Sequence, residues 1–165
     1  MTITTTLNHI RKHSPCGSGW EKLLRGLGKT EADDDPLPYS KIVEINGIED
    51  ALWCCRAEPE HAKTWRLLAV WCARQVQHLL PDDRAIAAID VAERYANGLA
   101  VVGEVSSAWF VGSAACWVAH EKAAVAALWS SEIALEMVDD GASDRAAALD
   151  AAKAAQKAKF LEMVG

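Results

Sequence analysis

Apolar and polar positions follow a helical period along most of this chain of 165 residues. The clearest case is the segment 60–80, where apolar side chains recur at i, i+3 and i+4 spacing over five turns. The stripe consists of Trp65, Leu68, Ala69, Cys72, Val76, Leu79 and Leu80. Leu67, Val70 and Trp71 lie off this stripe, so we expect a central helix that is covered on more than one side.

Turn and capping signals divide the remaining chain into further helices. Ser18 and Glu21 match a capping box, Gly28 suits a left-handed C-cap, and Ser40 suits an N-cap. No segment alternates apolar and polar residues long enough to form a sheet. The sequence predicts an all-α bundle of about seven helices. The helical ranges are near 6–13, 18–27, 40–45 with a restart at 48–57, 60–80, 83–96, 104 into the 130s, and 143–163.

The segment 101–129 is the most apolar part of the chain, and it has no charge from Val105 to Ala119. A membrane-spanning helix needs about 20 apolar residues, and charges at Glu104 and at Glu121 stop this run short. Alanines recur at every fourth position, which lets another helix approach closely. We therefore predict a core helix within a soluble protein, with three mostly buried tryptophans, Trp109, Trp117 and Trp129.

Length and composition predict one domain over residues 1–165. Its parts are N-terminal helices with an acidic loop (1–39), a middle set of helices (40–100) and an alanine-rich set (101–165). Of 30 alanines, 24 follow Asp83, and seven tryptophans supply bulk. Large rings against small-residue faces would pack the alanine-rich and tryptophan-rich C-terminal half.

The formal net charge is −6, and the basic residues are scattered. Binding to a phosphate backbone relies on clustered Lys and Arg, so direct nucleic-acid binding is disfavoured. The acidic residues are clustered, either as solvated loops and helix N-termini or as a surface that docks onto a basic partner, such as one that normally holds nucleic acid. The candidate partner-binding residues are Glu31, Asp33, Asp34, Asp35, Asp82 and Asp83.

The expected compartment is the cytoplasm of a bacterial host. The first residues, MTITTTLNHIRKH, lack an apolar signal core. Five cysteines, an odd number, fit reduced thiols. We expect no membrane association.

Few residues suggest chemistry. His9 and His13 lie one helical turn apart, and Cys16 could join them as a weak metal site, although a fourth zinc ligand would have to come from afar. Surface histidines near a terminus are the alternative. Gly28-Lys29-Thr30 resembles the end of a phosphate-binding loop, but Leu23 stands where that loop needs glycine. We expect no enzyme and no cofactor.

Two segments carry resemblances. Residues 67–100 (LLAVWCARQVQHLLPDDRAIAAIDVAERYANGLA) resemble a widespread bacterial helical module with a cysteine-containing helix, a His-Leu-Leu end, an Asp-Arg turn and a helix of the form A-x-[ED]-V-A-E-R-[YF]-A-x-G. A related pattern occurs in a family of immunity proteins. Residues 16–37 (CGSGWEKLLRGLGKTEADDDPL), with ALWCCRA at 51–57, resemble small alanine-rich proteins of phages and prophages. These resemblances imply no catalytic residue.

The first functional hypothesis is a non-enzymatic protein-binding factor of a phage or mobile element. Its sharper form is a counter-defence inhibitor, similar to anti-CRISPR proteins, that sterically blocks a bacterial protein or protein complex. The alternative is an immunity protein that neutralises a co-encoded toxin. A small metal-binding protein or enzyme built on His9, His13 and Cys16 is the second alternative, and a homodimer stays open.

Overall fold

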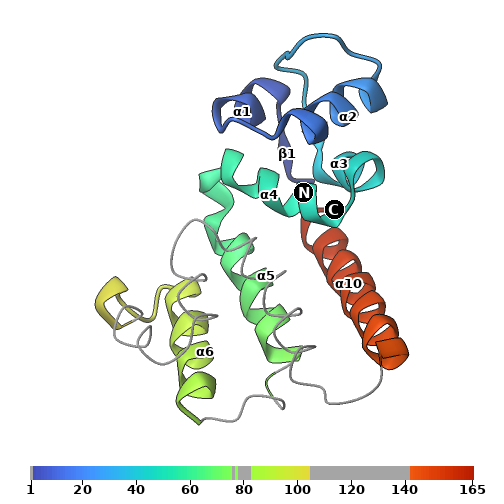
Figure 1. Ribbon diagram of the computed structural model, residues 1–165. Helices are drawn as coiled ribbons and strands as arrows, with labels where there is room; N and C mark the ends of the chain where they lie inside the picture. The colour runs from blue at the N-terminus through green and yellow to red at the C-terminus, as the bar shows by residue number, and fades with distance from the viewer. Residues whose placement is uncertain (1, 76, 78–82, 105–141) are drawn as a thin grey trace. The chain divides into compact units, whose positions relative to one another are not determined.

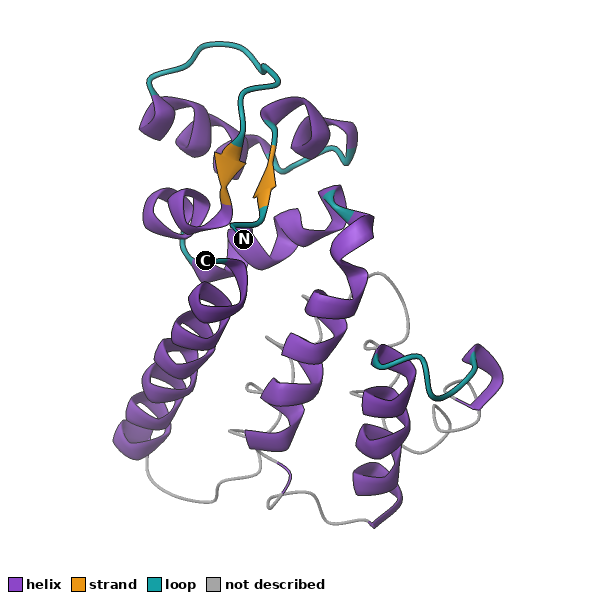
Figure 2. Ribbon diagram, turned by 180° about the vertical axis from the view of Figure 1, so that it is seen from behind, coloured by secondary structure: helices purple, strands orange, loops and turns teal. Residues whose placement is uncertain are grey.

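The computed structural model describes residues 2–75, 77, 83–104 and 142–165. Within these ranges the elements are helices apart from two strands of two residues each, so the predicted all-α fold class is confirmed (Figure 2). The short strand pair was not expected from the sequence, because two residues are too few to show an alternating pattern. The segment 105–141, with Trp109, Trp117 and Trp129, lies outside the described residues, so the predicted core helix there stays a prediction.

The helices up to Cys54 are short, and the longest described helix closes the chain (Figure 1). The α-helices are α1 (Leu7–Lys12), α2 (Gly17–Leu27), α3 (Tyr39–Asn46), α4 (Ile48–Cys54), α5 (Ala62–Gln75), α6 (Asp83–Ala96) and α10 (Ala142–Val164). Two 3₁₀ turns, η1 (Cys55–Ala57) and η2 (Pro59–His61), link α4 to α5. The strands β1 (Thr4–Thr5) and β2 (Leu37–Pro38) pair antiparallel.

The chain divides into two compact units. The N-terminal unit comprises Met1–Pro59 together with Lys157–Gly165, and the second unit comprises Glu60–Gln156. The N-terminal unit is therefore discontinuous in sequence, because the last turns of α10 belong to it. The prediction of one domain over the whole chain stays a prediction.

The core of the N-terminal unit includes both ends of the chain. Tyr39 and Phe160 are fully buried, and their rings meet edge to face with centroids 6.0 Å apart. The Tyr39 hydroxyl donates to the Cys54 carbonyl oxygen at 3.0 Å, which gives this buried polar group a partner. The Ile3 amide donates to the Val164 carbonyl oxygen at 2.9 Å. The C-terminus is thus fixed beside the first strand (Figure 1).

The capping signals were partly right. Thr6 caps α1 by accepting the His9 amide at 3.1 Å. Gly28 ends α2 with φ of +67°, as predicted. The capping box at Ser18 and Glu21 is wrong, because α2 begins at Gly17 and Ser18 lies inside its first turn. The N-cap predicted at Ser40 is also wrong, because α3 begins one residue earlier and follows the extended residue Pro38.

Helices α2 and α3 approach closely at Gly26. A Cβ atom at this position would lie 2.4 Å from Cγ2 of Ile45, too close for any side chain without a shift of α2 or α3. By contrast, a Cβ atom at Gly17 on the same helix would meet nothing within 4 Å. Glycine at position 26 therefore has a packing reason, which glycine at position 17 lacks.

In the second unit, α5 and α6 pack together. Arg74 on α5 binds two carboxylates of α6, Asp90 and Glu93, each at 2.6 Å. These hydrogen bonds raise the pKa of Arg74. Arg66 lies over the Tyr95 ring with its guanidinium carbon 4.9 Å from the centroid. Ion pairs and a cation–π contact thus reinforce the apolar contact between the two helices.

The predicted apolar stripe of the segment 60–80 is confirmed as far as the structure describes it. Four of its members are buried, and Val70, which lies off the stripe, is buried as well, so α5 is covered on more than one side. The other three, Val76, Leu79 and Leu80, lie outside the described residues. The buried members are Trp65, Leu68, Ala69 and Cys72.

The helix predicted at 83–96 has these bounds in the structure. Gly98 follows its end with φ of +75°, and the Leu99 amide donates to the Arg94 carbonyl oxygen at 2.8 Å, as in a Schellman cap. Within the described ranges, no helix combines the length and the apolar character needed to cross a membrane.

Candidate functional site

An apolar pocket of about 160 Å³ opens in the N-terminal unit. Its walls come from α1, from the turn before α2, and from α2, α3 and α4. Most of the lining is aliphatic or aromatic, and a few polar groups converge on it, which is the usual composition of a ligand site. The lining residues are Ile10, Pro15, Cys16, Gly19, Trp20, Leu23, Ile42, Asn46, Asp50, Trp53 and Cys54.

Helical spacing explains why these residues share one cavity. On α2 and its N-cap, positions 16, 19, 20 and 23 form one face. On α3 the lining positions are 42 and 46, and on α4 they are 50, 53 and 54, again one helical turn apart. Each helix therefore turns a single face to the cavity, and the two tryptophans, Trp20 and Trp53, come from different helices.

Gly19 allows α2 to approach the acidic wall of the pocket. A Cβ atom there would lie 2.9 Å from Asp50 Oδ2 and 3.0 Å from Cys16 Sγ. The backbone at position 19 therefore leaves room for the Asp50 carboxylate, which any side chain would displace.

Asn46 fixes the position of that carboxylate. Its side-chain nitrogen donates to Asp50 Oδ2 at 2.7 Å and to the Gly19 carbonyl oxygen at 2.8 Å. Both amide hydrogens are thus used, one toward α2 and one toward α4. This arrangement holds three helices together and presents Asp50 in a defined position.

Trp53 already binds one cation. The guanidinium carbon of Arg56 lies 4.2 Å from the Trp53 ring centroid, and Arg56 Nε donates to the Trp53 carbonyl oxygen at 2.9 Å. Partial burial lowers the pKa of Arg56, because it disfavours the charged form. Arg56 does not line the pocket. Trp53 thus both lines the pocket and holds the guanidinium group of Arg56 against its ring.

Among the described residues that line the pocket, Asp50 is the only acidic or basic one. The thiol of Cys54 stays neutral, because burial raises its pKa to about 12. The pocket therefore combines an apolar and aromatic wall with one negative charge. It attracts positive groups and repels anions.

The predicted acidic loop carries its own counter-ion. Lys29 binds Asp33, and its Nζ lies 2.8 Å from Asp35 Oδ2. Hydrogen bonding to Lys29 lowers the pKa of Asp33, and the two carboxylates raise the pKa of Lys29. Two of the four predicted acidic residues are thus compensated within the loop, and Glu31 and Asp34 remain exposed. Lys29 binds carboxylates, which agrees with the exclusion of a phosphate-binding loop.

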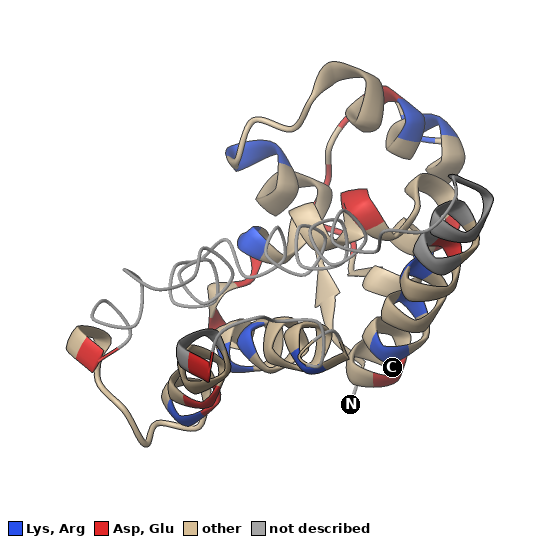
Figure 3. Cartoon of the chain, turned by 60° about the horizontal axis from the view of Figure 1, so that its bottom comes forward, with Lys and Arg blue, Asp and Glu red and all other residues tan. Residues whose placement is uncertain are grey.

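Basic residues lie beside part of this loop. Asp34 shares a shallow depression with Asn8, Arg11 and Lys12 of α1. Lys and Arg segments are distributed over several of the described helices (Figure 3). The loop is therefore a mixed-charge surface in which Lys29 leaves two exposed carboxylates, Glu31 and Asp34, unpaired with itself, and it is less acidic than its sequence indicates.

The other predicted acidic residues are Asp82 and Asp83, and the structure describes only Asp83. Asp83 is exposed at the first residue of α6, in the second unit. Asp82 lies outside the described residues. Whether these residues bind a partner stays a prediction.

The weak metal candidate is not assembled. His9 Nδ1 lies 2.9 Å from Oε1 of the buried Glu58, His13 is an exposed C-cap, and Cys16 lines the pocket. Among the residues that the structure describes, no three His, Cys, Asp or Glu side chains are grouped to hold a metal ion. The weak candidate set of His9, His13 and Cys16 is therefore not grouped as a metal site in the part of the chain that the structure describes.

The chain matches no family model, no curated protein and no solved structure in the comparisons made.

The sequence did not predict the pocket. The pattern that points to it is the helical spacing of Gly19, Trp20 and Leu23 on one helix and of Asp50 and Trp53 on another. That spacing shows two faces, but it does not show that they meet.

Proposed function

We propose that this chain is a non-enzymatic protein-binding factor of a phage or mobile element, and that it blocks its bacterial target sterically. The observation that carries this proposal is the pocket walled by Trp20 and Trp53. Interfaces draw most of their affinity from a few residues that are anchored in such pockets, and tryptophan is prominent among them.

The origin of the pocket walls supports the same proposal. The segments that resemble phage and prophage proteins are residues 16–37 and 51–57. They supply six of the eleven lining residues: Cys16, Gly19, Trp20, Leu23, Trp53 and Cys54. The segments that resemble phage and prophage proteins therefore supply about half of the described lining of the candidate site, including both tryptophans.

The acidic loop supplies the second component of the mechanism. It follows α2 directly, so its exposed carboxylates, Glu31 and Asp34, belong to the same unit as the pocket. Exposed charges act mainly on the association rate and on the choice of partner, whereas a filled apolar pocket slows dissociation. A basic bacterial protein or complex is the partner that this combination favours, and a counter-defence inhibitor similar to anti-CRISPR proteins is the sharper form of the proposal.

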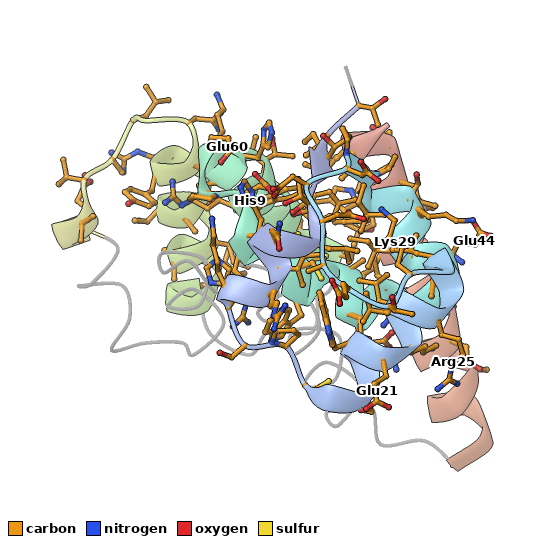
Figure 4. The ribbon with its side chains drawn as sticks, turned by 90° about the horizontal axis from the view of Figure 1, so that it is seen from above. His9, Glu21, Arg25, Lys29, Glu44 and Glu60 are labelled. Carbon is orange, nitrogen blue, oxygen red and sulfur yellow. The ribbon has the colours of Figure 1, made fainter. Side chains whose placement is uncertain are left out.

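The test compares two double variants of equal charge change. Glu31→Ser with Asp34→Ser removes the two exposed carboxylates of the loop that Lys29 does not bind. Glu21→Ser with Glu44→Ser is the matched control, because both residues are exposed in the same unit, Glu21 on α2 and Glu44 extending outward from α3 (Figure 4). Each protein is used to capture partners from a lysate of the host bacterium, and the captured partner is then purified for binding measurements.

We expect the loop variant to bind the captured partner more weakly, with a smaller dependence of affinity on salt, while the control binds as the parent does. Equal binding and equal salt dependence for all three proteins would contradict the role of the loop. Capture of no specific partner by the parent chain would contradict the proposed function itself.

A further inference from the structure

We propose that the pocket of the N-terminal unit accepts an arginine side chain of the protein partner. That the arginine belongs to a protein partner rests on the proposed function. The preference of the pocket for a guanidinium group rests on the pocket alone. The size of the cavity, the nature of its walls and the charge of Asp50 together favour this side chain.

The size fits one side chain. A cavity of about 150 Å³ is large enough to hold benzene, and this pocket measures about 160 Å³. The three methylene groups and the planar guanidinium group of arginine together occupy a volume of the same order.

The walls match the two parts of an arginine side chain. Ile10, Leu23 and Ile42 offer aliphatic surface to the methylene stem. Trp20 and Trp53 offer flat rings, on which a guanidinium group stacks more readily than an ammonium group. The stacking of Arg56 on Trp53 at 4.2 Å shows that this ring already takes a guanidinium partner within the chain.

Charge selects among the remaining ligands. An anion would be brought against Asp50, which Asn46 holds in place. A neutral apolar group would cover the Asp50 carboxylate and remove it from water without a compensating charge. A guanidinium group instead gives the carboxylate a charge-assisted hydrogen bond. Lysine can satisfy the charge, but its compact, strongly hydrated ammonium group gains less from the rings.

The test titrates small probes into the full-length, ¹⁵N-labelled chain and follows the indole N–H signals of Trp20 and Trp53. The signals are assigned with Trp20→Phe and Trp53→Phe. The probes are n-propylguanidinium (the arginine side chain), n-butylammonium (the lysine side chain), 1-butanol and butyrate. The tripeptide acetyl-Gly-Arg-Gly-amide presents the same side chain on a peptide backbone.

We expect n-propylguanidinium to shift both indole signals and to bind about fivefold to tenfold more tightly than 1-butanol, because only the cation pairs with the carboxylate. Asp50→Asn keeps the size of the side chain and its acceptor for Asn46, and it should remove this difference. The matched control is Glu49→Gln, the same charge change one residue away and outside the pocket. It should bind the probes as the parent does.

Three results would overturn the proposal. The first is that 1-butanol or butyrate binds the parent as tightly as n-propylguanidinium, or that Asp50→Asn leaves the preference intact. The second is that n-butylammonium binds as tightly as n-propylguanidinium, which would remove the preference for arginine over lysine. The third is that n-propylguanidinium binds but the tripeptide does not, which would assign the pocket to a free small molecule. The titration uses no partner, so its failure is separate from a failure of the capture experiment.

Discussion

Replacing Phe160 with alanine tests whether the end of α10 is a core element of the N-terminal unit. Phe160 is fully buried, and its ring meets the fully buried Tyr39 ring edge to face at 6.0 Å. It lies 121 positions after Tyr39 in the sequence (160 − 39), so this contact joins the two ends of the chain.

The expected loss follows from the size of the side chain. Truncation of a buried phenylalanine to alanine costs about 3–5 kcal/mol through lost burial and the cavity that remains. Whole domains of this kind are stable by about 5–15 kcal/mol, so the loss is a large share of the total. With a slope of about 2 kcal/mol per molar urea, the midpoint of unfolding should fall by about 1.5–2.5 M.

The assay is urea unfolding followed by circular dichroism, with Glu162→Ala as the control. Glu162 lies two residues further along the same helix, is exposed, and pairs with Lys159 at 2.7 Å. Such surface pairs contribute little, and the control should stay within about 0.5 kcal/mol of the parent. A loss below about 1 kcal/mol for Phe160→Ala would refute the assignment of the C-terminal turns to this core.

Three further predictions concern the packing of helix α2, the acidic loop and the thiols. Gly26→Ala should destabilise the chain by about 1–3 kcal/mol in urea unfolding, because the added Cβ overlaps the Ile45 side chain of α3. Gly17→Ala is the control and should be neutral or stabilising by up to about 1 kcal/mol. Equal effects of the two substitutions would contradict the close approach of α2 and α3 at Gly26. The Asp33 carboxyl should titrate below its ordinary value of 3.8 in an NMR pH series, because Lys29 stabilises its charged form. That stabilisation is present at neutral pH and is lost as the pH falls through the lowered pKa, and Lys29→Met should bring the titration back toward 3.8; no change in the variant would contradict the pair. Of the four cysteines described, Cys16 is exposed and should react first with iodoacetamide in peptide mapping, ahead of the three buried thiols; simultaneous labelling in the native state would contradict their burial.

Local signals in the sequence were sufficient for much of the helical organisation. The bounds of α6 and the left-handed cap at Gly28 depend on residues close together in the chain, and both were predicted. The capping box at Ser18 failed because the same residue type also occurs inside a first turn. The choice between the two positions depends on how Cys16 and the preceding turn place the backbone, which the motif alone does not encode.

The candidate site could not be predicted in the same way, because it depends on contacts between distant segments. Asp50 belongs to the pocket only because Asn46 and Gly19 bring α2, α3 and α4 together. The acidic loop shows the reverse effect. Its clustered carboxylates suggested a strongly acidic surface, but the nearby Lys29 folds back on two of them. Sequence clustering indicated the charges without indicating their partners.

The central claim is that Trp20, Trp53 and Asp50 form one site for a cationic side chain. The most direct measurement is a set of intermolecular nuclear Overhauser effects between n-propylguanidinium and the full-length chain. We expect contacts from the methylene protons of the probe to the indole protons of both Trp20 and Trp53, and we expect these contacts to be lost in Asp50→Asn. Contacts to other residues only, or contacts that persist unchanged in Asp50→Asn, would contradict it.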